Sequence, residues 1–255
     1  MERSTIILAG GFGERTKGLL GDIPKLLIKT ADGQTILDHI LRDLSGNKPE
    51  VTIVTNGYFY AQIAEYVSEN YPQSSVDTIN DQRMTPGERL GALGDLLFAI
   101  DKGKKAGGDI LVLPSDTAYW ESFSINDFLD FASLHPESFV TVVYDVKDPE
   151  KIRRNLGCVV LDEANRVTEF EEKPESPKST LAIIAIYLFR PEHIKLLREF
   201  GESGGDLNSP SNIIPFLMEH GIKISAFLSK GKVVDANGPS EISEAASYGA
   251  KQLQS

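Results

Sequence analysis

The chain of 255 residues has little of several things that common classes of protein need. It has one cysteine, which excludes an internal disulfide and a metal cluster held by thiolates. Its longest apolar run, Leu181–Phe189, has nine residues, whereas a membrane-spanning helix needs about 20. Positive charge is also scarce, since 26 basic residues face 37 acidic ones and leave a net charge of −11. A surface of this sign repels polyanions, so we do not expect general nucleic-acid binding.

The rest of the composition is that of a globular protein, with 41% hydrophobic and 25% charged residues. The amino end leads through only a short apolar stretch to a group of glycines, which is not the pattern of a secretory signal. We therefore predict a soluble, cytoplasmic protein that forms a single domain over residues 1–255.

In the first half, buried strands alternate with helices. Strands are predicted from β-branched apolar runs, and helices from apolar residues that recur on one helical face. The strands are expected at 5–9, 51–55, 110–113 and 140–144, and the helices at 36–44, 59–67, 93–100 and 125–132. This alternation predicts an α/β fold with a Rossmann-like mixed, mainly parallel sheet flanked by helices.

In the second half, strands and helices no longer alternate regularly. This pattern predicts a small lobe that packs against the parallel sheet of the first half. Turn residues at 162–165 predict a hairpin of strands 157–161 and 166–170, before a central strand at 181–189. Further helices are expected at 191–200, at 211–221 with a break or kink at Pro215, and at 239–253, with a strand at 222–228.

Residues 10–35 form an unusually long connection between the first strand and its helix, which is typical of a functional loop. Glycines directly after a parallel strand let backbone N–H groups approach a phosphate. The P-loop pattern fails because Leu19 follows Gly18, and the dinucleotide fingerprint fails because Thr16 replaces its third glycine. Residues 1–30 carry five bases and three acids, which suits a polyphosphate. An ordinary turn with solvated charges is the alternative.

Five motifs in order along nearly the whole chain resemble those of the sugar-1-phosphate nucleotidyltransferases, the nucleoside-diphosphate-sugar pyrophosphorylases. The branches most similar are the glucose-1-phosphate thymidylyltransferases and the mannose-1-phosphate guanylyltransferases. The motifs are Leu8-Ala9-Gly10-Gly11-x-Gly13-x-Arg15 with Pro24-Lys25, residues 90–96 (LGALGDL, against the family's LGTAGAL), Ser115-Asp116, Gly157 with Glu171-Glu172-Lys173-Pro174, and residues 234–239.

The resemblance implies a nucleotide-binding half at about 1–120 and a sugar-phosphate-binding half at about 121–255. The implied catalytic residues are Arg15, Lys25 and Asp116. The implied nucleotide-binding residues are Leu8, Ala9, Gly10, Gly11, Gly13, Arg15 and Gly91. Gln82 is added because the amides at 80–82 could read the edge of a pyrimidine base, although Asn56 and other residues are equally available for this. The implied sugar-phosphate-binding residues are Gly157, Glu172 and Lys173, and Arg154 and Asn155 are added for their position just before Gly157. Asp116 and Asp235 are implied to hold Mg²⁺. Asp235 is expected to follow a short strand at 232–234, and the sheet is expected to place both carboxylates at its carboxyl edge.

The residues themselves agree with these roles but leave alternatives open. Asp116 follows a predicted strand, and ligands of open α/β sheets bind outside the carboxyl ends of strands, although an ordinary turn aspartate would look the same. Glu172 and Lys173 are neighbours on a strand and face opposite ways unless the chain has already bent at Pro174. They could instead form an edge ion pair. Glu14 stands where the family has threonine, and it either faces solvent or helps to hold the metal.

The predicted activity joins an NTP to a sugar 1-phosphate and releases pyrophosphate, with dTTP and glucose 1-phosphate as the favoured pair. Alternatives are GTP with mannose or heptose 1-phosphate, another alcohol phosphate such as phosphocholine, and a catalytically silent sugar-nucleotide regulator. The expected partners are these small molecules, with no nucleic acid or membrane, and a homo-oligomer is an open alternative. The four histidines are expected in surface or capping roles, and Cys158 in the core.

Overall fold

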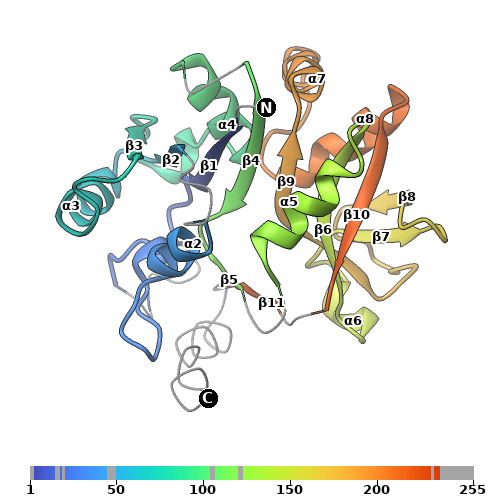
Figure 1. Cartoon of the computed structure of the whole chain (residues 1–255), viewed down its shortest axis with the longest axis horizontal. Helices are drawn as coiled ribbons and strands as arrows, with labels where there is room; N and C mark the ends of the chain where they lie inside the picture. Colours follow the sequence, from blue (N-terminus) through green and yellow to red (C-terminus); the bar gives the residue numbers. More distant parts are fainter. Residues whose placement is uncertain are drawn as a thin grey trace.

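The structure is a computed structural model of the chain, and Figure 1 shows its course. It describes residues 3–14, 18, 21–44, 50–103, 107–119, 123–230 and 233–235, with the backbone alone at 117–119 and 233–235. Among these residues, no helix is long and apolar enough to cross a membrane.

Four parallel strands in the order β3-β2-β1-β4 form the first part of the sheet. They are β1 (Arg3–Ala9), β2 (Glu50–Thr55), β3 (Val76–Asn80) and β4 (Asp109–Pro114). The apolar runs of β1, β2 and β4 are buried, as parallel strands covered by helices require, whereas β3 at the edge of the sheet is only partly buried. Ile6 contacts the core on one face of the sheet and Ile7 the core on the other.

The second part continues the sheet in the order β4-β9-β6-β10. Its strands are β6 (Ser138–Asp145), β9 (Leu181–Phe189) and β10 (Lys223–Ser229), and the hairpin of β7 (Cys158–Leu161) and β8 (Val167–Glu171) attaches to β9. β9 runs antiparallel to both β4 and β6, whereas β10 is parallel to β6. The predicted mixed, mainly parallel sheet is therefore confirmed.

Helices cover both faces of this sheet. On one face α2 (Ile36–Leu44), α3 (Tyr60–Asn70) and α5 (Ile125–Ser133) pack into one core. On the other, α4 (Ala92–Asp101), α7 (Pro191–Glu202) and α8 (Ile213–Glu219) pack into a second. The short α6 (Pro149–Ile152) precedes β7. Each long helix buries residues three and four positions apart, which is the period predicted from the sequence.

β9 changes partner along its length. Its last residues, Tyr187 to Phe189, pair with β4 on one side, whereas Ala182 near its start pairs with Cys158 of β7. The pairing of β9 with β6 skips Ala185 and Ile186, because Thr141 lies opposite Tyr187 and Val142 opposite Ile184. This irregularity is a β-bulge, which bends a strand and changes its twist. β4 and β7 therefore occupy different stretches of the same strand and diverge from one another.

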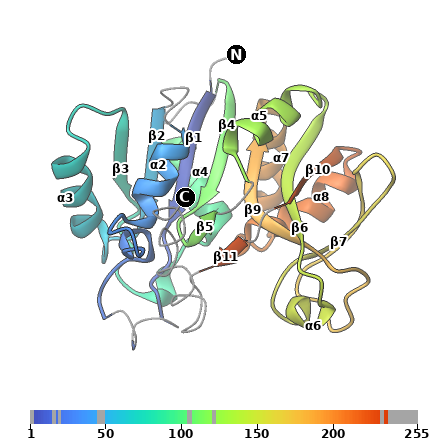
Figure 2. The ribbon, with the colours of Figure 1, turned by 60° about the horizontal axis from the view of Figure 1, so that its bottom comes forward.

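Two very short strands, which the sequence did not reveal as a pair, form a separate ribbon. β5 (Thr117–Tyr119) pairs antiparallel with β11 (Val233–Asp235). Figure 2 shows the two side by side below the main sheet. Asp235, predicted to follow a strand of the main sheet, is instead the last residue of β11 in this ribbon. Two β-strands of three residues lack the length for a periodic signal.

The connection at 10–35 contains local structure that the sequence did not predict. A 3₁₀ turn η1 (Lys25–Leu27) follows Pro24, and Lys29 and Thr35 form an isolated bridge. In α8, Pro215 is the third residue and so lies in the first turn, where a helix needs no proline N–H. The break lies before it, at the 3₁₀ turn η4 (Pro210–Asn212). The helix expected at 239–253 lies outside the described residues.

Two of the four histidines are buried, and one of these, His39, departs from the expected surface or capping role. His193 is a cap, since its Nδ1 accepts the Arg190 N–H at 3.1 Å, but its side chain is fully buried. His39 is buried beside Thr30, at 2.7 Å between Nε2 and Oγ1. Cys158 is buried as expected.

Candidate active site

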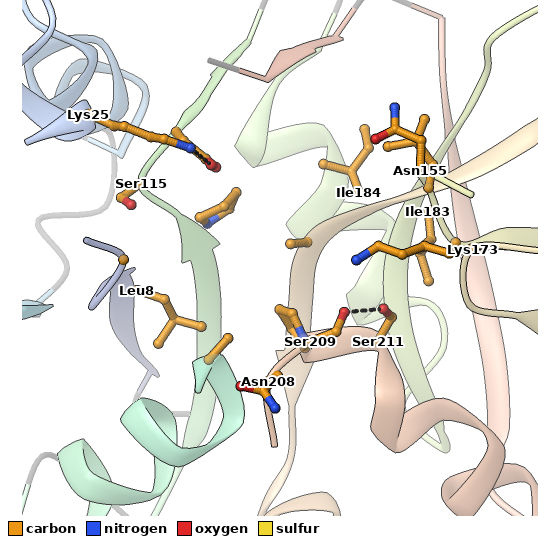
Figure 3. A pocket seen from close by; sticks show the side chains of 18 of the residues that line it. Leu8, Lys25, Ser115, Asn155, Lys173, Ile183, Ile184, Asn208, Ser209 and Ser211 are labelled. Atoms are coloured by element: carbon orange, nitrogen blue, oxygen red, sulfur yellow. Dashed lines mark hydrogen bonds and ion pairs between the residues drawn. The ribbon is translucent and has the colours of Figure 1, made fainter. Parts of the chain in front are cut away.

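A cavity of about 1240 Å³ lies where β4 and the β7–β8 hairpin diverge. Leu8 and Ala9 of β1 and Ser115 after β4 line one side, and Asn155 and Lys173 line the other. Figure 3 shows Lys25 and Lys173 reaching toward the same space from opposite sides. The bulged stretch of β9 supplies Ala185 between these walls. The cavity therefore lies at a switch point beyond the carboxyl ends of parallel strands, where open α/β sheets bind ligands.

The lining is electropositive in a chain that is strongly acidic. Seven described lysines and arginines and four described acids line the cavity, whereas the whole chain carries a net charge of −11. The basic residues are Lys25, Arg89, Lys147, Lys151, Arg154, Lys173 and Lys230. A concave surface of one sign concentrates ligands of the opposite sign, so this cavity favours anionic ligands.

The glycine loop after β1 forms part of the first wall. Gly11 and Gly13 line the cavity, and Gly13 has a φ of 65°, a conformation that side chains rarely adopt. The fully buried Asn56 donates from Nδ2 to the carbonyl oxygens of Gly10 and Gly11, at 3.1 and 3.2 Å. Asn56 thus fixes the path of the loop. Arg15, the predicted charge-stabilising residue, lies outside the described residues.

Lys25 and Asp116 meet on this wall. Lys25 begins η1, and its Nζ donates to Oδ2 of Asp116 at 3.0 Å. Asp116 lies two residues beyond the end of β4, as a ligand-facing aspartate would. In the ribbon, Asp235 lies opposite Thr117, the residue after Asp116. The backbone of Asp235 is therefore adjacent to that of Asp116, through the ribbon rather than through the main sheet as the prediction had it.

The opposite wall holds Glu172 and Lys173, which both line the cavity although they are neighbours. β8 ends at Glu171, and Lys173 has a φ of 49°, so the chain turns at Lys173 before it reaches Pro174. Their nearest charged atoms, Lys173 Nζ and Glu172 Oε1, are 3.8 Å apart. Gly157 lies beneath them, since a Cβ there would come within 3.1 Å of Glu172 Oε2. The two side chains thus form the ion pair of the alternative prediction, and both also line the cavity.

Glu172 is held by a hydroxyl network that the sequence analysis missed. Ser211 donates from Oγ to Oε2 at 2.7 Å, and Ser209 to Oε1 at 3.2 Å. Tyr187 is buried and hydrogen-bonds to Ser211, and burial, with the charge of Glu172, raises the pKa of its hydroxyl. Serines beside a proline carry no sequence signal for this role, because they approach Glu172 only through the packing of η4 against β9.

Three predicted nucleotide-binding residues do not line the cavity. Gln82 is exposed in a left-handed turn with a φ of 66°, and its N–H donates to Asn80 Oδ1. Gly91 begins α4 with a φ of 81°, and a Cβ there would meet Leu207 at 2.4 Å. Gly10 precedes Gly11 in the loop and packs against the side chain of Asp95. Their binding roles stay predictions, as does that of Arg15.

Further polar residues line the cavity on the second wall. Arg154 and Asn155, suggested by their position before Gly157, are among them, together with Lys147, Lys151 and Asn208. Lys147 donates to Asp145 at 2.6 Å, and this bond, with one from Thr180, lowers the pKa of Asp145 to about 2. Glu14 is well exposed, with Oε2 3.7 Å from Arg89 NH1, as the solvent-facing alternative expected.

Asp116 and the backbone position of Asp235 fit a magnesium site. Magnesium takes few protein carboxylates and completes its octahedron with water and substrate phosphate oxygens. Among the described side chains no group of three or more potential metal ligands occurs, so an all-protein cage is not offered there. An aspartate on a cationic cavity wall, with a second aspartate adjacent in the backbone, suits a metal that arrives with phosphates. The family is generally Mg²⁺-dependent.

The fold and the cavity define an α/β protein that has a glycine loop of the kind that binds phosphates. Its cationic cavity lies at the carboxyl ends of the parallel strands. A family model described as nucleotidyl transferase matches residues 4–247. The chain therefore belongs to the nucleotidyl transferase family, which confirms the family predicted from the five motifs.

Curated relatives and solved structures agree with this assignment. The chain is 28% identical over 247 residues to the bifunctional protein GlmU of Methanocaldococcus jannaschii, covering 95% of this chain and 53% of that protein. It is 24% identical over 238 residues to a glucose-1-phosphate adenylyltransferase of Desulfitobacterium hafniense, covering 89% of this chain and 58% of that protein. The chain thus spans between half and three fifths of the length of these relatives.

Two solved structures share the fold. One is a candidate glucose-1-phosphate thymidylyltransferase from Bacillus anthracis in complex with sucrose, with a TM-score of 0.76, 20% identity, and coverage of 96% of this chain and 94% of that one. The other is HddC from Yersinia pseudotuberculosis complexed with GMP-PN, with a TM-score of 0.67, 22% identity, and coverage of 96% and 98%. Both support the α/β architecture.

Proposed function

We propose that this protein joins an NTP to a sugar 1-phosphate, forming a nucleoside-diphosphate sugar and pyrophosphate. The observation that carries the proposal is a single cationic cavity with a glycine loop and Lys25 on one wall and Glu172 and Lys173 on the other. Its volume exceeds that of ordinary small-ligand sites, which gives room for two substrates side by side. The names of the relatives, which include adenylyl and thymidylyl transferases, support the same reaction.

The chemistry needs positioning more than acid–base catalysis. A phosphate oxygen of the sugar 1-phosphate attacks the α-phosphorus of the nucleotide in line, and pyrophosphate leaves from the opposite side. Because the attacking oxygen is already anionic, no general base is required. Catalysis then rests on orientation and on neutralising charge that develops in the transition state.

The residues divide this work between the two walls. The loop N–H groups at Gly11 and Gly13 would bind nucleotide phosphates, and Arg15 and Lys25 would stabilise charge on the α-phosphate and on pyrophosphate. Lys173 would hold the sugar phosphate, and Glu172 would accept hydrogen bonds from sugar hydroxyls. Asp116 and Asp235 would hold Mg²⁺, which when bound offsets negative charge on the phosphates. In the structure Lys25 occupies Oδ2 of Asp116, and it would turn to a phosphate when substrate enters.

The first pair to test is dTTP with glucose 1-phosphate. GTP with mannose or heptose 1-phosphate is the alternative, which the guanine nucleotide bound by HddC supports. NTPs and sugar phosphates are metabolites of the cytoplasm, where we expect the reaction. Assaying pyrophosphate release from purified protein over a matrix of NTPs and sugar 1-phosphates, with Mg²⁺, tests the proposal. Release that needs both substrates supports it. Calorimetric binding of both with no release across the matrix would favour a silent regulator instead, and release with phosphocholine alone would change the acceptor class.

A further inference from the structure

Two buried carboxyl groups lie directly behind the glycine loop, outside the cavity. Asp95 comes from the first half of α4, and its side chain is 5% exposed. Asp81 follows the end of β3 and is 4% exposed. The reaction proposed above uses neither. In the motif at 90–96, Asp95 stands where the family's pattern has alanine.

Asp95 packs against the loop backbone at Gly10. A Cβ built on Gly10 would lie 2.0 Å from Oδ2 of Asp95, far inside van der Waals contact, so this carboxyl fills the space of a side chain at position 10. Asn56 holds the carbonyl oxygens of Gly10 and Gly11. The loop is therefore clamped between the Asn56 amide and the Asp95 carboxyl.

Asp81 ties the same clamp to the neighbouring loop. Its Oδ1 accepts the N–H of Arg83 at 2.8 Å, and its own N–H donates to the carbonyl of Thr55 at 2.9 Å. The N–H of Gly57 donates to the carbonyl of Arg83 at 2.8 Å and also acts on the Asp81 carboxylate. These bonds fix both sides of Gln82, a residue whose amide is predicted to contact the base of the nucleotide. The side chain of Asp81 is also a hydrogen-bond neighbour of the Asp95 side chain, so the pair links the glycine loop to the loop that carries Gln82.

Two adjacent buried carboxyl groups cannot both ionise at low cost, so one of them keeps a proton. Burial, the charge of Asp81 and a hydrogen bond with Asp81 raise the pKa of Asp95 to about 8. Burial also raises the pKa of Asp81, but two backbone N–H groups and the charge of Arg83 favour its ionised form. Oδ1 of Asp95 has no hydrogen-bond donor among the described residues. The proton of the pair therefore resides on Asp95, which donates it to Asp81.

We propose that Asp95 is a positioning residue for the nucleotide: in its neutral form it donates to Asp81 and so holds the glycine loop and the Gln82 loop together in the geometry that binds NTP. This inference rests on the proposed function for the identity of the ligand. When Asp95 loses its proton in alkaline solution, two negative charges face each other beneath a phosphate-binding loop. The charge of Arg83 favours the ionised form of Asp81, whereas the charge that acts on Asp95 among the described residues is that of Asp81, which disfavours its ionisation.

The test compares the wild type with Asp95→Asn across pH 6.5 to 9.5. The amide of asparagine donates at every pH, so it mimics the neutral carboxyl. For the wild type, the Kd of the preferred NTP by calorimetry and its KM are expected to rise about tenfold between pH 8 and pH 9, following one ionisation, with a much smaller change in kcat. Asp95→Asn is expected to bind as tightly at pH 7 and to lack the rise. Ionisation of the substrate affects both proteins equally and cancels in the comparison.

Two controls make the comparison specific. Asp101→Asn changes an exposed aspartate at the far end of the same helix, paired with Arg198 at 2.7 Å, and is expected to keep the wild-type alkaline rise. Asp95→Ala removes the donor and leaves a cavity, so NTP binding is expected to weaken at all pH values. A rise of the same size in Asp95→Asn as in the wild type would overturn the proposal.

If the variant folds poorly, the ionisation of Asp95 can still be measured directly in the wild type, without an activity assay. In carboxyl ¹³C NMR of the wild type, a signal that is absent from Asp95→Asn is expected to titrate near pH 8. If every carboxyl of the wild type titrates below pH 6, the inference is wrong. Normal NTP binding with this titration but without pyrophosphate release would overturn the proposed function alone. Pyrophosphate release with a flat wild-type pH profile would overturn the inference alone.

Discussion

Lys25 and Asp116 lie 91 residues apart in the chain and form an ion pair of 3.0 Å on the wall of the cavity. Their side chains are 17% and 26% exposed, so each can reach a ligand. The pair joins the end of the glycine loop to the end of β4, the two segments that would surround the nucleotide phosphates. The cation and the anion neutralise each other in this structure, and each would become separately available to phosphates and metal.

Lys25→Ala is expected to lower kcat by roughly 10²–10³, as the loss of one charge-stabilising donor does. Its free energy of unfolding should change by no more than about 1 kcal/mol, because the ion pair is partly exposed to solvent. Pyrophosphate release and urea unfolding of the same preparation measure both quantities. Wild-type turnover in this variant would mean that Lys25 does not contact the transferring phosphate.

Asp116→Asn and Asp235→Asn are each expected to reduce turnover severely, and the double variant should be little worse than either. The register of β11 on β5 brings the two backbones together, and residues that act as one unit show non-additive losses. Mg²⁺-dependent pyrophosphate release of the four proteins completes the cycle, with melting temperature as the check on folding. Losses that multiply would argue against a shared metal, and a lowered melting temperature with intact activity per folded molecule would make the two aspartates structural.

Ser211→Ala should raise the KM for the sugar 1-phosphate by about tenfold, the equivalent of one hydrogen bond, while the KM for NTP stays near the wild-type value. Without Ser211, Glu172 loses its shorter bond and the buried Tyr187 hydroxyl loses its partner. The free energy of unfolding should fall by about 1–3 kcal/mol. Ser209→Ala is the matched control, since its bond is longer at 3.2 Å, and it should have the smaller effect. Equal shifts in both KM values would contradict a role confined to the sugar wall.

His193 predicts a loss of stability in acid. Burial lowers its pKa from 6.5 to about 4 in the folded protein, so the unfolded chain binds a proton first as the pH falls. The stabilisation is present above pH 6.5 and is lost as the pH falls toward 4, by roughly 2–3 kcal/mol between pH 7 and 4.5. Urea unfolding of wild type and His193→Gln at both pH values isolates this contribution from that of the carboxylates. An equal acid loss in both proteins would refute it.

Much of the scaffold follows from local patterns. The strand at 181–189 was predicted with the bounds that β9 has, because nine apolar residues in a row fit only a strand buried on both faces. Helix α2 followed from the spacing of Ile36, Leu37, Ile40 and Leu44, all buried. The residues Lys25, Asp116, Glu172 and Lys173 were named from motifs, and the structure brings all four to one cavity. Their catalytic and binding roles stay predictions.

Features that depend on packing between distant segments were not predictable. The sequence places Lys173 and Glu172 on opposite faces of a strand, and only the left-handed φ at Lys173 turns both to the cavity. The contact of Asp95 with Gly10 joins residues that are 85 positions apart. Its one sign in the sequence is an acid at a position where the family has alanine, and that difference alone does not predict which residue the acid contacts. Ser211 acts through proximity to Glu172, for which no spacing in the sequence is diagnostic.

The bulge of β9 at Ala185 and Ile186 has a mechanical consequence. One continuous strand belongs to both halves of the molecule, pairing with β4 at one end and with β7 at the other. Any closing movement of the halves over bound substrates must therefore bend this strand at its irregular point, where two residues are free of the pairing with β6. The amplitude of such a movement is limited by hydrogen bonds on either side. The protein would then close by bending one continuous strand, which resists the movement, rather than by rotation about a flexible linker.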